Sequence, residues 1–250
     1  MYDIDPIAPL ARDGVPRDGG GPVFAGTRVQ GTLRSIATSR LRHAAFSSGT
    51  DAPAWKRMLD RVGAGLAMIA LAPLVALLAV AIKLESRGPV FFRQRRVGKD
   101  GRIFEMLKLR SMCENAEALR NALESENEME GGVLFKLEQD PRITRVGHFI
   151  RRWSLDELPQ LWNVWRGDMS LVGPRPALPE EVEQYPAEAW RRLDVLPGLT
   201  CLWQIQGRST LPFEKQVELD LEYVDRMSFA LDLQILIGTV PAVLSGDGAH

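Results

Sequence analysis

The sequence predicts an α+β, mostly helical domain that is held at a membrane by one apolar helix. The segment Val62 to Ile82 contains 21 residues without a charge, about the length of helix that crosses the roughly 30 Å hydrocarbon core. Beyond it, apolar positions are interrupted every few residues and Gly and Pro are frequent, which is typical of a water-exposed domain. With 45% hydrophobic residues in 250, the chain can bury one sizeable core, and a second full domain is not expected.

The positions of the cysteines and histidines argue against a disulfide-linked domain and against a zinc-binding domain. Cys113 and Cys201 lie far apart without a CxxC spacing, and the three histidines are scattered. Neither a disulfide framework nor a zinc site is therefore expected, which fits a reducing compartment. The N-terminus is acidic and proline-rich and lacks the apolar core of a cleaved secretory signal.

Residues 1–52 are rich in Gly, Pro, Ser and Arg and show no sustained apolar period, which predicts a disordered tail. From Gly19 to Thr50 the tail has four arginines and no acid. This basic half could rest on anionic lipid, or it could be a solvated linker.

Basic residues flank the apolar segment on both sides, so both of its ends carry the charge signature of the cytoplasmic side. These residues are Lys56, Arg57, Arg61, Lys83, Arg87, Arg93, Arg95 and Arg96. Pro73 lies at the middle of the segment, where it removes one helical hydrogen bond and clashes with the preceding turn. We therefore predict a re-entrant helical hairpin over residues 53–88. The alternative is a complete span with a proline kink, which membrane helices tolerate.

The remainder, residues 89–250, is expected to form a domain on the cytoplasmic side that carries the functional site. Val90 to Arg93 and Arg102 to Leu109 are predicted strands around a Lys99-Asp100-Gly101 turn, and Ser111 to Glu130 is a predicted helix. Phe229 to Leu244 is strongly apolar but contains Asp232, Gly238 and Pro241. This composition favours an interfacial amphipathic helix over a second span.

Two basic clusters suit the binding of phosphate groups, because guanidinium groups bind phosphate oxygens in a bidentate manner. The first comprises Arg93, Arg95, Arg96, Lys99, Arg102, Lys108 and Arg110, and the second comprises Arg142, Arg145, His148, Arg151 and Arg152. Nucleic acid is disfavoured as a partner, since the interleaved aromatic residues of single-strand readers are absent. A solvated face beside an anionic membrane would account for part of this charge.

Two adjacent carboxylates, Asp156 and Glu157, directly follow the second basic cluster. Ser154 and Glu157 have the spacing of a capping box, which predicts a helix start. Capping leaves Asp156 unexplained, and beside this positive charge we expect it to stay ionised and to face a bound phosphate. Because an ionised carboxylate can attack phosphorus, Asp156 is a candidate nucleophile as well as part of a helix start.

The segment Ser154 to Pro176 resembles the signature of the bacterial sugar transferase family, the monotopic phosphoglycosyl transferases. The other matching segments, in the family's order, are Gln94 to Gly98, Lys108 to Met112, Asp140 to Thr144, and Pro197 to Thr200 leading into Leu202 to Gln204. Together the matches cover Ala54 to about Ser245. Members of the longer branch carry additional N-terminal spans, so this chain is expected to be the catalytic unit behind a short tail.

The resemblance implies transfer of a hexose-1-phosphate from a UDP-sugar to polyprenyl (undecaprenyl) phosphate, with release of UMP, at the cytoplasmic face of the bacterial inner membrane. Asp156 corresponds to the nucleophile that forms a covalent phosphosugar intermediate, and Glu157 completes the acidic pair. A Mg²⁺ ion would be bound by the diphosphate and Asp156. The candidate phosphate contacts are Lys108, Arg110, Arg175, Gln94 and Arg96. This reaction would initiate exopolysaccharide, capsule or O-antigen synthesis.

The implied partners are UDP-sugar, polyprenyl phosphate and membrane lipids, and the resemblance is compatible with a homodimer. Two departures from the family pattern concern Ala72, where many relatives have a Ser before the proline, and Cys201, where they have a Gly. Asp168 lies in a Gly-Asp-Met turn, where a turn role competes with a metal role. Two other functions stay open: a glycosyltransferase that releases UDP, and a non-catalytic membrane adaptor.

Overall fold

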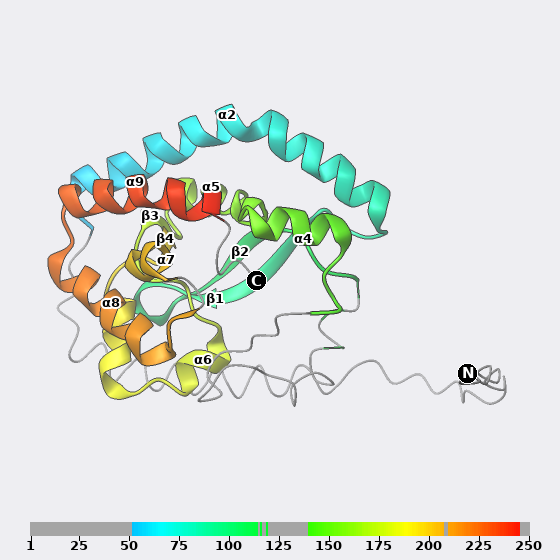
Figure 1. Ribbon diagram of the computed structural model, residues 1–250. Coiled ribbons are helices and arrows are strands. Elements are labelled where there is room, and N and C mark those ends of the chain that lie inside the picture. Colours follow the sequence, from blue (N-terminus) through cyan, green and yellow to red (C-terminus); the bar gives the residue numbers. More distant parts are fainter. Residues whose placement is uncertain (1–51, 115, 117–118, 120–139, 208–209, 246–250) are drawn as a thin grey trace, which may run out of the picture.

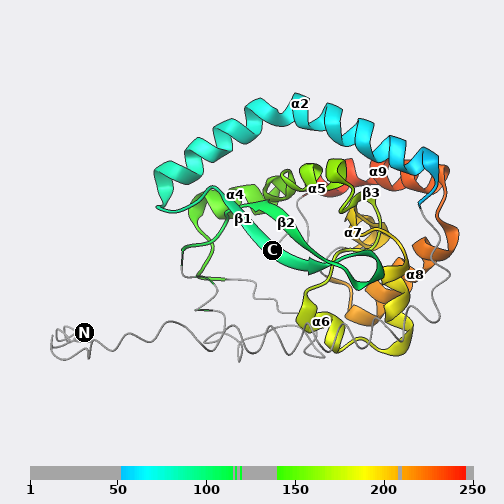
Figure 2. The same ribbon diagram turned by 180° about the vertical axis from the view of Figure 1, so that it is seen from behind.

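The computed structural model describes residues 52–114, 116, 119, 140–207 and 210–245. The predicted tail and most of the predicted helix from Ser111 to Glu130 lie outside this part of the chain. The described part is mostly helical and contains two small two-stranded sheets. This arrangement confirms the predicted α+β class. Figures 1 and 2 show one long helix, α2, lying over the remaining elements.

Helix α2, Ala54–Glu85, contains the predicted apolar segment and continues without interruption through Pro73. In the described part of the chain it is the one helix long and apolar enough to cross a membrane, and little of its apolar stretch is covered by protein. Its large exposed side chains are Met58, Val62, Leu66, Ile69, Leu77, Val80 and Leu84. Figures 1 and 2 show α2 as a broad arch whose two ends turn toward the rest of the protein.

A buried ion pair fixes the N-terminal end of α2. Lys56 donates to Asp232 at 2.6 Å and to the carbonyl oxygen of Val172 at 3.0 Å. The hydroxyl of Tyr223 donates to the other oxygen of Asp232 at 2.7 Å. One turn further along, Asp60 accepts from the backbone N–H of Leu171. Since buried charges must be paired, this set of contacts joins α2 to the C-terminal half of the domain.

The C-terminal end of α2 is attached to the same domain by different residues. Arg110 donates to the carbonyl oxygen and the hydroxyl of Ser86 at 2.8 and 2.9 Å. The carboxylate of Glu85 accepts from the backbone N–H groups of Arg145 and Val146 at the start of α4, Arg145–Arg152. An acidic group is favourable there, because the first N–H groups of a helix have no internal partner.

Two strands bring several predicted site residues to one face. Strands β1, Phe91–Val97, and β2, Ile103–Leu109, form an antiparallel pair around the turn η1, Lys99–Gly101. The first strand is longer than predicted, and the second and the turn are as expected. Alternate positions of β1, including Gln94 and Arg96, are the more buried ones, and Lys108 lies opposite Phe92 on the same face.

The second sheet joins β3, Ser170–Val172, to β4, Gly198–Thr200, in parallel. The chain passes so closely here that a Cβ atom at Gly198 would lie 2.1 Å from the backbone nitrogen of Gly173. Only glycine fits at such an approach. Helix α5, Gln160–Arg166, is bonded to the first sheet, because Asn163 accepts from the N–H of Leu107 and donates to the carbonyl of Glu105.

Helices α4, α5 and α9, Phe229–Ser245, lie along the side of the domain that faces α2 in both views. The predicted helix from Phe229 to Leu244 is therefore confirmed as α9. Large apolar side chains stay exposed on these three helices: Phe149, Trp162, Trp165, Phe229, Leu233, Ile237, Val240 and Leu244. Trp162 and Trp165 stack on each other with ring centroids 5.2 Å apart. An exposed apolar surface of this extent is typical of a membrane-facing side.

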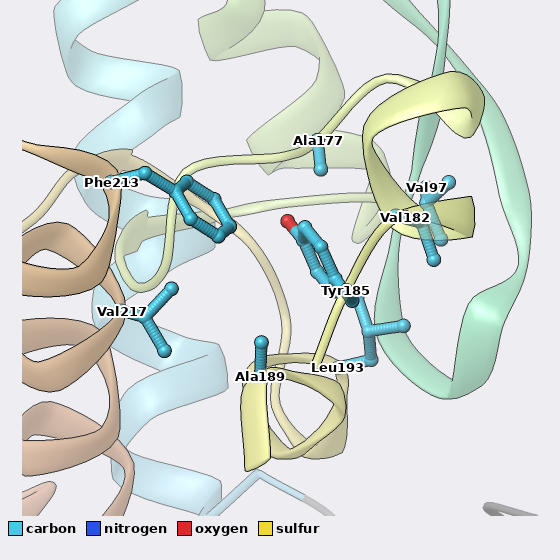
Figure 3. Close-up of a cluster of buried hydrophobic side chains, with 8 residues drawn as sticks. All are labelled: Val97, Ala177, Val182, Tyr185, Ala189, Leu193, Phe213 and Val217. Atoms are coloured by element: carbon cyan, nitrogen blue, oxygen red, sulfur yellow. The ribbon is translucent and has the colours of Figure 1, made fainter. Parts of the chain in front are cut away.

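A compact apolar cluster holds the opposite side of the domain together (Figure 3). Tyr185 lies between Phe213 and Val182, and its ring centroid is 5.8 Å from that of Phe213. The cluster joins β1, α6 (Pro179–Glu183), η4 (Ala187–Asp194) and α8 (Phe213–Arg226). Helix α7, Leu202–Gln206, packs in a neighbouring cluster with α8 and α9.

The buried contact of Lys56 leads to a stability prediction. Lys56→Ala should lower the free energy of unfolding by about 3 to 5 kcal/mol, because it leaves Asp232 charged and buried without its cationic partner. Chemical denaturation in detergent, followed by circular dichroism, measures this change. The control Lys215→Ala removes the exposed partner of Glu218 and should cost less than about 1 kcal/mol. Equal losses in the two variants would contradict the prediction.

Candidate active site

The acidic pair lies in a tight turn between α4 and α5. Asp156 and Glu157 belong to the short 3-10 helix η3, Leu155–Glu157, and Ser154 immediately before it has a left-handed backbone with φ 53°. A residue other than glycine in this conformation costs of order 1–3 kcal/mol, and such strain is common at functional sites. The predicted capping box is wrong, since Ser154 makes no side-chain capping hydrogen bond. Glu157 is instead held by two cations.

These two cations come from different elements. Lys108 on β2 donates to Glu157 Oε1 at 2.9 Å, and its ammonium lies 3.8 Å from Asp156 Oδ2. Arg175, in the loop after β3, donates to the same oxygen of Glu157 at 3.3 Å. Asp156 is 8% exposed. The turn, the hairpin and the loop thus place two carboxylates and two cations around one buried point.

The two carboxylates have opposite electrostatic environments. Burial opposes ionisation of Glu157, but Lys108 and Arg175 outweigh it and lower the pKa of Glu157 to about 2. Burial raises the pKa of Asp156; Lys108 acts in the other direction, and the charge of Glu157 raises the pKa further. The sequence led us to expect an Asp156 kept firmly ionised by the basic cluster. In the structure the nearest cations are bonded to Glu157, so burial dominates at Asp156.

All seven predicted site residues line one cavity of about 1400 Å³. They are Gln94, Arg96, Lys108, Arg110, Asp156, Glu157 and Arg175. These residues are distant in the sequence, from β1 to the loop after β3. The β1–β2 hairpin and α5 bring them together. The structure therefore confirms that these residues are brought together, whereas their individual roles stay predictions.

Two of the predicted phosphate contacts, Arg96 and Arg110, bind backbone carbonyl oxygens. Arg96 donates to the side chain of Gln94 and to the carbonyl oxygen of Pro176, and burial lowers its pKa to about 10. It thereby fixes the loop that carries Arg175. Arg110 binds the end of α2, as described above. Both arginines line the cavity, and both also connect its wall to neighbouring backbone.

The residues at the far side of the cavity escaped sequence reasoning. Tyr185, Arg192, Trp203 and Gln216 all line it. Arg192 donates to the hydroxyl of Tyr185 at 2.7 Å and pairs with buried Asp220 at 2.7 Å. Tyr185 lies between α6 and η4, and the other three come from η4, α7 and α8. Trp203 lies in a segment that matches the family, whereas no local motif marks Tyr185, Arg192 or Gln216. Only the packing of the three helices shows that they belong to the same cavity.

The two other sequence-based questions have structural answers. Cys201 has an extended backbone with φ −152°, which any residue adopts, so the replacement of glycine does not disturb this turn. Asp168 forms an ion pair with Arg166 and accepts a hydrogen bond from the Asn163 side chain. These contacts show a turn-stabilising role for Asp168.

Within the described ranges, no group of three or more His, Cys, Asp or Glu side chains is placed to hold a metal. Binding of a divalent ion by Asp156 together with substrate oxygens stays a prediction. Asp156 suits this arrangement, because it lines the cavity and its nearest cation is 3.8 Å away rather than in direct hydrogen-bond contact. Mg²⁺ commonly binds in this way, through one or two carboxylates plus substrate phosphates.

The fold and the cavity define a class of protein: a membrane-associated domain that holds a buried acidic pair next to two basic side chains. The particular family follows from comparison with known proteins. The family model for bacterial sugar transferases matches residues 52–246. The chain belongs to the bacterial sugar transferase family.

Three relatives show the range of the family. The galactosyl transferase CpsE of Streptococcus agalactiae is 46% identical over 195 residues, which are 78% of this chain and 43% of CpsE. The exopolysaccharide production protein ExoY of Sinorhizobium fredii is 42% identical, over 78% of this chain and 88% of ExoY. A UDP-glucose:undecaprenyl-phosphate glucose-1-phosphate transferase of Caulobacter vibrioides is also 42% identical, with 72% of its length covered. The chain thus spans less than half of CpsE and most of ExoY.

The cations that hold Glu157 ionised predict that its contribution to folding stability depends on pH. Because the pKa of Glu157 is lowered to about 2 from 4.5, its ionised form stabilises the folded protein above pH 4.5. This contribution should disappear as the pH falls from 4.5 toward 2. The stability advantage of the wild type over Glu157→Gln should therefore shrink across this interval, measured by unfolding in detergent.

Glu180→Gln provides the control, because Glu180 is exposed on α6. Its stability difference from the wild type should be nearly constant over the same interval. A Glu157→Gln difference that is equally independent of pH would show that Lys108 and Arg175 do not hold Glu157 ionised.

Proposed function

We propose that this protein is a phosphoglycosyl transferase that moves a hexose-1-phosphate from a UDP-sugar to a polyprenyl phosphate such as undecaprenyl phosphate, and releases UMP. The observation that carries the proposal is the buried pair of Asp156 and Glu157 in a large cavity beneath an apolar helix, where Lys108 and Arg175 donate to Glu157. The names of relatives support the substrate classes, since one of them is a UDP-glucose:undecaprenyl-phosphate glucose-1-phosphate transferase.

In the first step, a carboxylate oxygen of Asp156 forms a bond to the β-phosphorus of the UDP-sugar. The bond from this phosphorus to the oxygen that bridges the two phosphates breaks, and UMP leaves with the electron pair. Lys108 and Arg175, which contact Glu157 at 2.9 and 3.3 Å, would neutralise the charge of the diphosphate. The product on the protein is a sugar-phosphoryl aspartate.

In the second step, an oxygen of the acceptor phosphate attacks the same phosphorus. The bond to the Asp156 oxygen breaks, which restores the carboxylate and gives a polyprenyl diphosphate sugar. Glu157 remains the permanent anion of the pair, because its lowered pKa keeps it ionised. It can hold Lys108 and Arg175 in place through both steps.

We further propose that Mg²⁺ binds between Asp156 and the diphosphate. When bound, the ion would supply positive charge that lowers the repulsion between two anions. Lys108 and Arg175 act from the other side, and Arg151 also lowers the pKa of Asp156 through its charge. Together these charges favour the ionised form of Asp156, which the reaction requires.

The two attachments of α2 support a re-entrant topology. Lys56 near its start and Arg110 near its end tie both termini of the helix to the same domain. A straight span would place these termini on opposite sides of the bilayer. We therefore propose that α2 enters and leaves the membrane on the cytoplasmic face of the inner membrane.

Single cysteines test this topology. In a variant without Cys113 and Cys201, Arg57→Cys and Arg87→Cys should both react with a membrane-impermeant thiol reagent only from the cytoplasmic side, because both positions are exposed beside the attached ends of α2. Labelling in intact cells and in inverted vesicles gives the measurement. Reaction of either cysteine from the periplasm would show a complete span.

The covalent step is tested by Asp156→Asn. The amide is nearly the same size but is a far poorer nucleophile, so turnover should fall by about 10³-fold or more. With a UDP-sugar labelled in the sugar and without acceptor, the wild type should release UMP and acquire hydroxylamine-sensitive label. Asp156→Asn should acquire none, whereas Glu157→Gln keeps the nucleophile and can still be labelled.

Two outcomes of this assay would exclude the proposal. Label on Asp156→Asn equal to that of the wild type would remove Asp156 as nucleophile, and direct attack by the acceptor phosphate would become the leading mechanism. Release of UDP instead of UMP would identify a glycosyltransferase that moves the sugar alone. A wild type that releases neither nucleotide from a panel of UDP-sugars would favour a non-catalytic adaptor.

A further inference from the structure

The cavity that contains the acidic pair continues into an apolar half between the two membrane-facing helices α2 and α9. Its walls there are Ala67 and Leu71 from α2 and Leu236, Val240 and Val243 from α9. The hydroxyls of Thr200 on β4 and Thr239 on α9 are hydrogen-bonded at 2.8 Å and also line the cavity. One continuous space therefore runs from two carboxylates to the apolar surface of two helices.

Helix α9 presents different faces to the cavity and to the outside. Leu236, Thr239 and Val243 are spaced by three and four positions, so they share one face, and all three line the cavity. Ile237 is 64% exposed and is not part of the cavity wall. Val240 lies at the rim, because it lines the cavity and is still 60% exposed. The apolar half therefore opens at the surface on which α2 and α9 expose their apolar side chains.

We propose that this apolar half, between α2 and α9, binds the isoprenoid chain of the acceptor while its phosphate reaches Asp156. The inference rests on the proposed function and assigns one part of the cavity to one substrate. A polyprenyl phosphate has a charged end that needs cations and a chain that is excluded from water. The cavity likewise has charged side chains at the end with Asp156 and apolar side chains between α2 and α9. A UDP-sugar has no long apolar part, so the donor leaves this half free for the acceptor.

The two half-reactions can be measured separately, so an effect on acceptor binding can be distinguished from an effect on donor binding. Val243→Trp fills the apolar half from α9, and Val243 is half-buried and outside the main apolar clusters, so the fold should tolerate the change. The KM for undecaprenyl phosphate should rise at least about tenfold, which corresponds to about 1.4 kcal/mol. UMP release and protein labelling in the absence of acceptor should stay at the wild-type level, which also shows that the variant is folded.

Ile237→Trp is the matched control, because it places the same side chain on the same helix but outside the cavity. It should leave both half-reactions unchanged. Chain length provides a second measurement: the wild type should strongly prefer undecaprenyl phosphate to farnesyl phosphate, and Val243→Trp should lose most of this preference. A general defect in the membrane binding of α9 would instead affect both Trp variants equally.

Three results would overturn the inference. An unchanged KM for undecaprenyl phosphate in Val243→Trp would place the chain elsewhere. Loss of acceptor-independent labelling in a Val243→Trp protein with the circular dichroism of the wild type would assign this half to the donor. An unchanged preference for chain length would indicate that it holds a membrane phospholipid. A wild type without UMP release from any UDP-sugar is a separate outcome, because it removes the proposed function itself.

Discussion

The attachment of both ends of α2 to one domain is the constraint on which the rest of the structure depends. At one end a buried lysine, Lys56, is bonded to Asp232, and at the other Arg110 binds backbone and hydroxyl oxygens of Ser86. Each contact withdraws a cation from water and therefore requires a specific partner at a specific distance. The middle of the helix is left to expose its apolar side chains. The helix thus becomes the roof of the cavity as well as a membrane element.

This constraint also explains how residues from distant parts of the sequence meet around the acidic pair. Arg110 follows directly after β2, so the strand that carries Lys108 is fixed to the end of α2. Glu85 holds the start of α4, and the turn with Asp156 follows the end of the same short helix. The acidic pair and its cation are consequently positioned by two contacts with one helix end. A shift of that end would move both.

The two neighbouring carboxylates of the site, Asp156 and Glu157, differ in their electrostatic environment and therefore in their pKa. Glu157 receives both direct cation contacts, and it is the group whose pKa is lowered to about 2. Asp156 lies in the same turn but is buried without an equivalent bond, so burial raises its pKa. A carboxylate without strong partners is the more reactive nucleophile once a substrate brings compensating charge. The difference between the two residues arises because Lys108 and Arg175 form hydrogen bonds with Glu157, whereas Asp156 is buried without such a bond.

The sequence by itself determined the elements whose signals are local. The uncharged segment predicted α2, the Lys99-Asp100-Gly101 turn predicted the hairpin, and the motif around Asp156 predicted the site, because each depends on residues close together in the chain. Tertiary structure alone decided that Glu157 binds Lys108 and Arg175 instead of capping a helix, since both partners come from other elements. It also decided that Tyr185 and Arg192 share the cavity and that α9 forms an apolar wall opposite α2. Such contacts depend on how helices pack against each other, and this packing does not produce a fixed spacing of residues that could be recognised in the sequence.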